Sequence, residues 1–435
     1  KKSAKSSDTP HYENVPFEVP SSWVWCRLED IAYVASGSTP DKTCFVENGV
    51  PYIKMYNLRN QKIDFAYHPQ YITEEVHNGK LQRSRTEVGD LIMNIVGPPL
   101  GKLAIIPTTL PQANFNQAAV LIRPYKFKEV LVSYLKVYLE EMSEINSIAT
   151  RGSAGQVNIS LTQSQNMRIP IPPLNEVRRI IEEVSKYDIL IDSLKQNITD
   201  IQNLIAYTKS KILDLAIHGK LVLQDPNDEP AIELLKRINP DFTPCDNGHY
   251  TFDVPSGWIT TNLGSIFNVV SAKRILKSDW KHSGVPFYRA REIAKLSIYG
   301  LVDNELYISE EHYNSLKEKF PVPKASDIMI SAVGTIGKCY IVKESDKFYY
   351  KDASVLCLCN DYQINAKYIY HIMRSEYMLK QMYDNSKGTT VDTITIEKAK
   401  QYILPLPPLA EQQRIVAKIE ETFSIFDGIQ NSLEA

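Results

Sequence analysis

The sequence lacks the features of a membrane-bound or disulfide-rich secreted protein. No apolar run reaches the roughly 20 residues that a transmembrane helix needs, and the polar start "KKSAKSSDTPHY" has no apolar signal-peptide core. Only six cysteines occur in 435 residues, and none forms a CxxC pair. Cys357-x-Cys359 lies in the apolar run "ASVLCLC", which favours buried strand thiols over a zinc site. We expect a reducing, cytoplasmic setting with no membrane partner and no metal.

The sequence also lacks the motifs of nucleotide and methyl-transfer chemistry. "VGPPLGK" from Val96 and "VGTIGK" from Val333 resemble a P-loop, but three and two residues separate the glycines where four are required. Leu103 and Cys339 stand where Ser or Thr would bind magnesium. There is no Asn-Pro-Pro-aromatic motif, no strand-borne GxGxxG and no recognisable carboxylate–lysine nuclease core. We therefore predict no catalytic residue and no cofactor in this chain.

An internal repeat at an offset of 235 residues organises what is present. "FEVPSSWVWCRLEDI" from Phe17 matches "FDVPSGWITTNLGSI" from Phe252, and "GVPYIKMYNL" from Gly49 matches "GVPFYRAREI" from Gly284. Near the ends, "IPIPPLNEVRRII" from Ile169 matches "LPLPPLAEQQRIV" from Leu404. The matches are mostly apolar, Gly and Pro, whereas the polar residues differ. Two lobes with one scaffold and different surfaces are predicted.

Each lobe is expected to be mixed α/β. "DLIMNIV", "KLAIIP" and "AAVLIRP" are short apolar runs bounded by Gly and Pro, as in strands. "SYLKVYLEEMSEI" from Ser133 and "AKYIYHIMRSEYMLKQM" from Ala366 have helical spacing. Trp23, Trp25 and Trp258 stand at the repeated start of the lobes, where core packing is the better interpretation than base stacking.

The stretch between the lobes predicts one long helix with a coiled-coil seam. Apolar residues recur at alternating steps of three and four, interrupted by Thr208. A helix over 174–217 would be about 65 Å long at ~1.5 Å per residue, so its seam needs a partner, which the segment after 408 supplies in the same phase. An intramolecular coiled coil is therefore expected. Its seam residues are Val177, Ile180, Val184, Tyr187, Ile191, Leu194, Ile198, Ile201, Ile205, Ile212, Leu215, Ile415, Ile419, Phe426, Ile429 and Leu433.

The proline straps before both helices are predicted to be extended and stiff, because prolines cannot continue a helix interior. Pro173 and Pro408 precede the helices, and Glu176 and Glu411 favour the positive end of the helix dipole. "HGK" from His218 is an ordinary helix stop with a glycine after it. The second helix ends at Ala435, partway along its repeat partner, which suggests a trimmed chain.

These features together resemble the specificity (S) subunit of type I restriction–modification enzymes. The two "PxPPLxE" straps, the long helices and "LAIHGKLVLQDPNDEPAIELLKRI" from Leu215 carry the resemblance. It implies two target-recognition domains, each recognising half of a bipartite double-stranded DNA site. It also implies that the two long helices pack as an antiparallel intramolecular coiled coil that acts as a spacer. It implies no catalysis in this chain. Two methyltransferase (M) subunits using S-adenosylmethionine and two restriction/translocase (R) subunits using ATP and Mg are the implied partners.

The expected organisation is an N-terminal arm (1–16), target-recognition domain 1 (17–173), the spacer helix (174–217), a connector (218–251), target-recognition domain 2 (252–408) and a C-terminal spacer helix (409–435). Two alternatives stay open: a specificity module of a related, type IIB-like system, and a coiled-coil scaffold that binds only proteins. The net charge of −2 does not decide among them, because basic patches can be local.

Candidate DNA-contacting residues are polar loop residues where the lobes diverge, together with the lysines of the two Gly-Lys turns. Arg can pair with guanine, and Asn or Gln with adenine, through two hydrogen bonds, while turn lysines suit phosphates. In the first lobe they are Lys54, Asn57, Arg59, Arg83, Arg85, Lys102, Asn116, Gln117, Arg151, Ser153 and Gln156. In the second they are Lys273, Arg274, Arg289, Arg291, Lys338, Lys351, Asp352, Lys387, Thr389 and Thr390.

Overall fold

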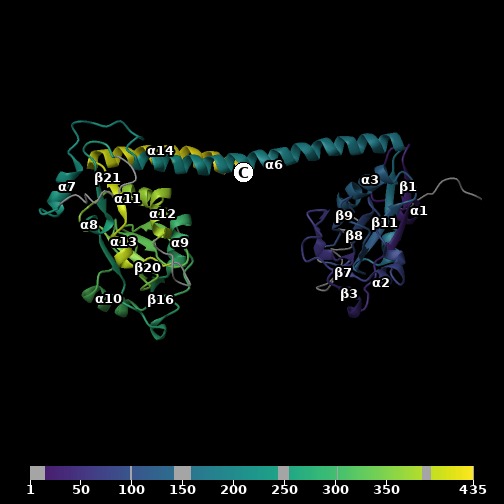
Figure 1. Ribbon diagram of the computed structural model, residues 1–435, viewed down its shortest axis with the longest axis horizontal. Helices are drawn as coiled ribbons and strands as arrows, with labels where there is room; N and C mark the ends of the chain where they lie inside the picture. Colours follow the sequence, from purple (N-terminus) through teal and green to yellow (C-terminus); the bar gives the residue numbers. More distant parts are fainter. Residues whose placement is uncertain are drawn as a thin grey trace, which may run out of the picture. The chain divides into compact units, whose positions relative to one another are not determined.

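The computed structural model describes residues 15–97, 100–141, 158–242, 254–300, 302–384 and 393–434. The chain divides into two compact units, unit 1 up to Leu194 and unit 2 from Lys195. Each unit contains one of the repeated lobes (Figure 1). Within the described residues, no helix has both the length and the apolar composition required to cross a membrane.

The central sheet of unit 1 is four-stranded and antiparallel, with strand order β2-β11-β8-β9. The runs predicted as strands supply β8, β9 and β11. Alternate residues of β8 enter two separate cores: Leu91 and Met93 face one, and Ile92 faces the other. Burial on both faces explains the unbroken apolar runs. The strands are β2 (Ala32–Ser36), β8 (Leu91–Asn94), β9 (Leu103–Ile105) and β11 (Ala119–Pro124).

Shorter strands and helices surround this sheet. A second sheet has the order β10-β4-β7-β3, a hairpin pairs β5 with β6, and β1 pairs with β12. The strands are β1 (Val24–Arg27), β3 (Phe45–Val46), β4 (Val50–Ile53), β5 (Leu58–Arg59), β6 (Lys62–Ile63), β7 (Tyr71–Ile72), β10 (Asn114–Phe115) and β12 (Arg168–Ile171). The helices are α1 (Leu28–Ile31), α2 (Glu74–Asn78), α3 (Lys128–Glu141) and α5 (Leu161–Gln165).

Unit 2 repeats this arrangement in the same chain order, which confirms the predicted repeat. Its four-stranded sheet is β14-β20-β17-β18, its second sheet is β16-β15-β19, and β13 pairs with β21. The strands are β13 (Ile259–Asn262), β14 (Asn268–Ser271), β15 (Val285–Tyr288), β16 (Tyr307–Ile308), β17 (Ile328–Ser331), β18 (Cys339–Ile341), β19 (Tyr349–Tyr350), β20 (Val355–Cys359) and β21 (Ile403–Leu406). The helices are α7 (Ala231–Ile238), α8 (Leu263–Ile266), α9 (Ala290–Tyr299), α10 (Glu310–Lys319), α11 (Ala366–Met373), α12 (Glu376–Asp384) and α13 (Ile396–Lys400).

The lobes differ in the segment that follows the equivalent strands β4 and β15. In unit 1 this segment forms a short 3-10 turn and the β5–β6 hairpin. In unit 2 it forms the ten-residue helix α9. The sequence marked this stretch as divergent, but the change of secondary structure was not predicted.

The helical segment from Ala366 is two helices rather than one continuous helix. α11 ends at Met373, and α12 begins at Glu376. The Ser375 hydroxyl accepts a hydrogen bond from the Met378 amide at 3.3 Å, so a serine caps the new helix. Helical spacing continues across the break, which is why the sequence pattern did not reveal it.

Both proline straps are strands that close the lobes. The straps β12 and β21 pair with β1 and β13, the strands at the start of each lobe. The hydroxyls of Tyr134 and Tyr368 donate to the carbonyls of Pro170 and Pro405, one in each strap. The predicted extended conformation is confirmed, and the pairing explains why the strap and lobe-start sequences repeat together. Trp25 and Trp258 are buried beside them, as expected.

A single helix, α6 (Leu174–Ile217), follows the first strap, and α14 (Leu409–Glu434) follows the second. Within unit 2, α14 lies along the second half of α6 (Figure 1). Lys209 of α6 pairs with Asp427 at 2.5 Å and lies over the Phe423 ring. The last turns of α6 and the first turns of α14 share one core through Ile212 and Ile415. The two helices are therefore antiparallel.

The predicted seam divides by burial. Val177, Ile205, Ile212, Ile415 and Ile419 are buried; Ile180, Val184, Ile198, Phe426 and Leu433 are half-buried; Tyr187, Ile191, Leu194, Ile201, Leu215 and Ile429 are exposed. Leu215 was expected in the seam, but it is 40% exposed, while Leu213 is buried at 5%. Here α6 packs on the lobe as well as on α14, so Leu213 and Ala216 form a broader apolar face than a coiled-coil seam.

The end of α6 is the helix stop expected at "HGK". Gly219 has a φ of 64°, in the left-handed region. The amide of Lys220 donates to the Leu215 carbonyl at 2.9 Å, and the His218 Nδ1 lies 2.7 Å from the Asp214 carbonyl. His218 thus belongs to a helix end.

Candidate nucleic-acid interface

The Gly-Lys turn of unit 2 connects β17 to β18. Gly334 and Gly337 have φ values of 77° and 76°. Ser331 holds the turn, because its carbonyl accepts the Gly337 amide and its hydroxyl accepts the Lys338 amide, both at 3.0 Å. A strand follows the turn, whereas a nucleotide-binding P-loop leads into a helix. The turn therefore presents Lys338, which is exposed, without forming a nucleotide site.

The equivalent turn of unit 1 connects β8 to β9. The carbonyl of Asn94 accepts the Gly101 amide at 3.2 Å, and its side chain accepts the Val96 amide at 3.0 Å. The next residue, Lys102, is half-exposed. The Leu103 amide donates to the Gln61 side chain at 2.7 Å, which ties the β5–β6 hairpin to the turn. The divergent segment and the turn are thus neighbours in unit 1.

Lys54 and Arg59 lie in this divergent segment among aromatic rings. The Arg59 guanidinium lies 4.0 Å from the centre of the Tyr67 ring, and its Nε is 3.9 Å from an Asp64 oxygen. Lys54 lies over the Phe45 ring at 5.5 Å. Tyr67 is exposed, but its ring already contacts Arg59, Tyr56 and His68, so it positions the Arg59 guanidinium at the surface. Sequence reasoning did not select Tyr67, although aromatic and cationic residues are both frequent in 54–68.

Asn57 was a candidate for base contact, but the structure gives it another role. Its side chain is fully buried. Its amide nitrogen donates to the carbonyls of Asp64 and Tyr67 at 3.1 and 2.7 Å, and its oxygen accepts the Lys54 amide. All of these bonds shape the segment. Asn57 therefore holds the loop rather than facing DNA.

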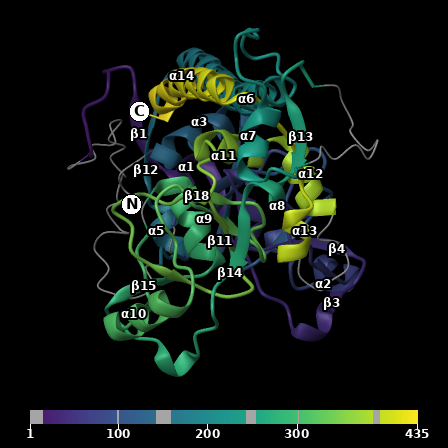
Figure 2. The same cartoon turned by 90° about the vertical axis from the view of Figure 1, so that its left-hand side faces the viewer.

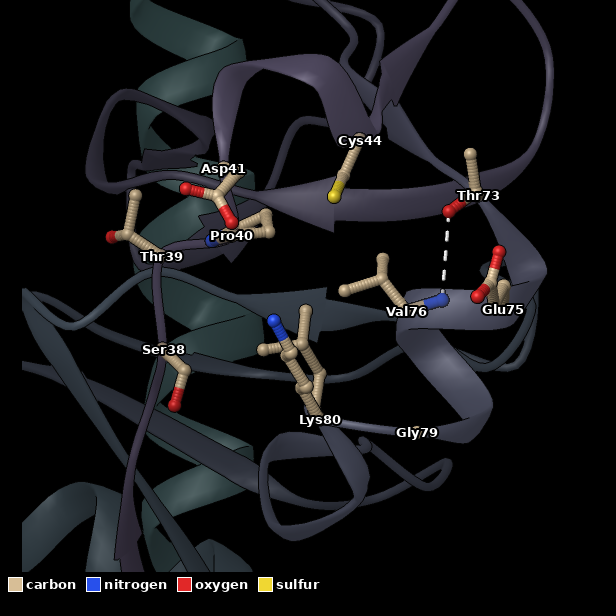
Figure 3. A pocket seen from close by; sticks show the side chains of 11 residues that line it. Ser38, Thr39, Pro40, Asp41, Cys44, Thr73, Glu75, Val76, Gly79 and Lys80 are labelled. Atoms are coloured by element: carbon tan, nitrogen blue, oxygen red, sulfur yellow. Dashed lines mark hydrogen bonds between the residues drawn. The ribbon is translucent and has the colours of Figure 1, made fainter.

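Arg83 contacts a residue that lines a cavity of about 460 Å³ in unit 1. Its guanidinium donates to the Ser38 hydroxyl at 3.2 Å, and Ser38 lines the cavity with Asp41, Glu75 and Lys80. The amino end of Lys80 points toward the wall formed by residues 38–41 (Figure 3). Two carboxylates make the cavity unsuitable for a phosphate, but Asp and Lys side chains match the donors and acceptors of base edges.

The other unit 1 candidates have mixed surroundings. Arg85 donates to the His77 carbonyl at 3.1 Å and the Asn78 side chain at 2.6 Å, so its guanidinium is engaged within the lobe. Asn116 is half-buried, and its side-chain oxygen has no partner in the described part of the chain. Gln117 is exposed. Arg151, Ser153 and Gln156 lie outside the described residues.

Arg289 and Arg291, the unit 2 candidates at the start of α9, are ion-paired. Both donate to Glu292, which is 2% exposed, at distances from 2.5 to 3.0 Å, and Arg291 also pairs with Glu305. Burial opposes ionisation, but the hydrogen bonds from Arg289 and Arg291 outweigh it and hold the pKa of Glu292 below its usual value. Both guanidinium groups are therefore engaged by carboxylates and are not free to pair with guanine.

The remaining unit 2 candidates are mostly exposed. Lys273, Arg274 and Lys351 are exposed, and Asp352 is half-exposed. The ammonium of Lys273 lies 5.7 Å from the Phe320 ring centre. Lys387, Thr389 and Thr390 lie outside the described residues.

Asp327, Cys357 and Cys359 form a buried group in unit 2 whose ligand atoms lie within 4.8 Å of one another. The Asp327 oxygens already accept the amides of Lys324 and Asn360 at 2.8 Å. The Cys357 thiol has a raised pKa because of its hydrogen bond with Cys359 and its burial. The group offers three ligands, whereas a structural zinc site has four. We therefore interpret these side chains as part of the packed core rather than as a metal site.

Comparisons with known proteins agree on one family. The type I restriction modification DNA specificity domain matches residues 20–203 and 255–435. The type I restriction enzyme EcoEI specificity subunit of Escherichia coli is 24% identical over 498 aligned residues, covering 97% of this chain and 81% of that protein.

Two solved structures share the fold. One, described as the structural basis of complex assembly and conformational transition of the type I R-M system, has a TM-score of 0.59 at 19% identity, covering 96% of this chain and 94% of that chain. The HsdS subunit from Thermoanaerobacter tengcongensis has a TM-score of 0.52 at 18% identity, with 96% and 92% covered. With a repeated lobe, a long helix and two matched regions, this chain belongs to the family of type I restriction modification DNA specificity domains and contains two of them.

Proposed function

We propose that this chain is the specificity subunit of a type I restriction–modification complex and that each lobe recognises one half of an asymmetric, bipartite DNA site. The observation that carries the proposal is the difference between otherwise equivalent lobes: next to the Gly-Lys turn, unit 1 has a hairpin and unit 2 has a helix. Shared scaffolds with different polar surfaces suit two unlike half-sites, because base contacts carry sequence information.

The long helices set the distance between half-sites and dock the methyltransferase subunits in this proposal. Half-sites about one DNA turn apart, roughly 34 Å, are expected for two lobes held by a spacer. The chain itself is non-catalytic. Two M subunits use S-adenosylmethionine, and two R subunits use ATP and Mg. All described cysteines are free thiols, which supports a cytoplasmic location.

Lobe exchange tests the proposal. Residues 252–408 are replaced by the second lobe of another family member, and methylated sites are mapped in cells that also express the M subunits. One half-site should change while the other, recognised by unit 1, is retained. The reciprocal exchange of 17–173 is the matched control and should change the opposite half.

Other outcomes discriminate the alternatives. A change of both half-sites, or of neither, would contradict recognition by separate lobes. Failure of the purified complex to bind any DNA duplex would favour a protein-only scaffold. Sequence-specific methylation with a type IIB-like cleavage pattern would assign the same lobes to a related system.

A further inference from the structure

A cavity of about 300 Å³ opens beside the Gly-Lys turn of unit 2. Figure 2 shows unit 2 toward the viewer, with α9 and α11 near β18, and both helices contact that strand. Among the described residues that line the cavity, two are cations and none is a carboxylate. The polar lining consists of Ser297, Lys338, Tyr370, Arg374 and Tyr383.

Neither cation has a carboxylate partner within the described residues. Arg374 donates to the Tyr370 hydroxyl at 3.2 Å, and its guanidinium carbon lies 5.0 Å from that ring's centre. The stack limits the freedom of the guanidinium without neutralising it. This contrasts with Arg289 and Arg291, whose charges are balanced by Glu292. Two uncompensated positive charges therefore share one concave surface.

At this cavity the Gly-Lys turn and α12 lie very close to each other. A Cβ on Gly337 would lie 2.8 Å from the Met382 sulfur of α12, in addition to requiring a left-handed φ. Glycine therefore lets α12 pack against the turn.

The fold does not require a cation at position 374. Tyr134 and Tyr368 are equivalent, because each hydroxyl bonds the corresponding strap proline. Six residues after them stand Glu140 in unit 1 and Arg374 in unit 2. Glu140 is paired with Lys136 at 3.0 Å. The same scaffold thus accepts a neutralised glutamate in one lobe, and the free arginine is a property of unit 2 alone.

We propose that this cavity binds a backbone phosphate of the target DNA, with Lys338 and Arg374 as its anion-binding pair. The inference rests on the proposed function and adds Arg374, which sequence reasoning did not select. Lysine and arginine contacts to phosphate position a protein on the duplex and carry no sequence information directly. Arg374 and Lys338 therefore contribute to the affinity for DNA and to the position of unit 2 on the duplex, and other residues discriminate between bases.

Salt dependence of DNA binding tests this role. Arg374→Gln and Lys338→Gln are made in the full chain, co-purified with its M subunits, and affinities for cognate and mismatched duplexes are measured by fluorescence anisotropy over a series of salt concentrations. Removing both cations in the Arg374→Gln and Lys338→Gln double variant should reduce the magnitude of the slope of log affinity against log salt by about 0.9, because one neutralised phosphate is lost, and each single variant should reduce it by part of that amount. Affinity for both duplexes should fall by the same factor, roughly five- to tenfold.

Matched variants separate the cavity from general charge and from folding. Lys317→Gln removes an exposed charge on α10, outside the cavity lining, and should leave the slope unchanged. Arg374→Lys keeps the charge and should restore most of the slope. Thermal midpoints equal to wild type show that Arg374→Gln does not act through stability.

Three results would overturn the inference. Wild-type slopes in both Gln variants would show that the cavity takes no DNA phosphate. Altered discrimination between cognate and mismatched half-sites would make Arg374 a base-reading residue. Stabilisation of wild type but not Arg374→Gln by inorganic phosphate, with unchanged DNA slopes, would assign the cavity to a free anion. The proposed function fails separately, if wild type does not distinguish the two duplexes.

Discussion

Asp90 and Asp327 occupy the same position in the two lobes, but different groups contact their carboxylates. Asp90 accepts two hydrogen bonds from Arg123, at 2.9 and 2.6 Å, and pairs with Lys128 at 2.7 Å. Asp327 accepts backbone amides and has the Cys357 thiol nearby. Burial raises the pKa of Asp327 above its usual value, although the backbone hydrogen bonds partly oppose it. Polar cores can therefore diverge within a shared scaffold.

His371 should make the stability of unit 2 sensitive to pH. It is buried in α11, its Nδ1 has no hydrogen-bond partner in the described part of the chain, and its ring packs edge-on against Phe423. Burial, then Arg374, lowers its pKa from 6.5 to about 4, against the opposing charge of Glu420. Between these values the unfolded chain binds a proton that the folded chain does not. Stability should therefore fall with decreasing pH, by at most about 3 kcal/mol from this residue.

The measurement is thermal unfolding of wild type and His371→Phe from pH 7 to 4. As the pH decreases, the thermal midpoint of the variant should rise relative to that of wild type, because the variant has no group at position 371 to protonate on unfolding. His282→Phe, at an exposed position, is the control and should follow the wild-type profile. Parallel profiles for His371→Phe and wild type would show that His371 is protonated equally in both states.

At the scale of single elements, α6 shows how tertiary packing changes a sequence pattern. Its alternating spacing predicted a narrow seam, and Ile205 and Ile212 fit it. Near its end the helix also packs on the lobe, so adjacent residues Ile212 and Leu213 are both buried. Periodicity revealed that the helix has an apolar face, but the width of that face depended on a second neighbour that the sequence alone did not place.

Leu213→Ala and Leu215→Ala form a matched pair that tests this packing. Leu213→Ala should lower the free energy of unfolding by about 3 kcal/mol, because it opens a cavity in the core. Leu215→Ala should change it by less than about 1 kcal/mol, since 40% of the residue is already exposed and alanine favours helix. Urea unfolding of both variants gives the comparison. Equal decreases in the free energy of unfolding would show that Leu215 is buried in the seam.

At the scale of the whole molecule, the two units have separate cores. The largest core of unit 1 extends from Leu28 to Val177, and that of unit 2 from Ile212 to Ile419. Domains with their own cores can unfold independently. We therefore expect two unfolding transitions in urea rather than one.

Substitutions in each core should move only one transition. Arg123→Met leaves the buried Asp90 with Lys128 as its remaining side-chain cation among the described residues, and should destabilise unit 1 by about 3 kcal/mol. Ile419→Ala should destabilise unit 2 by a similar amount through a cavity. Circular dichroism and tryptophan fluorescence, recorded during urea unfolding, follow the two transitions in each variant. A common shift of both transitions in either variant would mean that the units unfold together.

The repeated order of elements, the long helix, the strand identity of the apolar runs and the family could be predicted from the sequence. The candidate DNA residues stay predictions. Arg59 and Lys338 are exposed and therefore accessible to DNA, whereas Asn57 is buried and Arg289 is ion-paired. Arg374, which we propose as a phosphate contact, was not selected from the sequence because nothing in "HIMRSEY" distinguishes it from an ordinary helix-end arginine.

Local pattern therefore determined the scaffold, because apolar periodicity, glycine turns and proline straps act through near neighbours in the chain. Only the tertiary structure decided which charges are available. An arginine is neutralised or free according to the side chains that packing brings beside it. Glu292 reaches Arg289 and Arg291, while the cavity around Lys338 and Arg374 contains no carboxylate among its described lining residues.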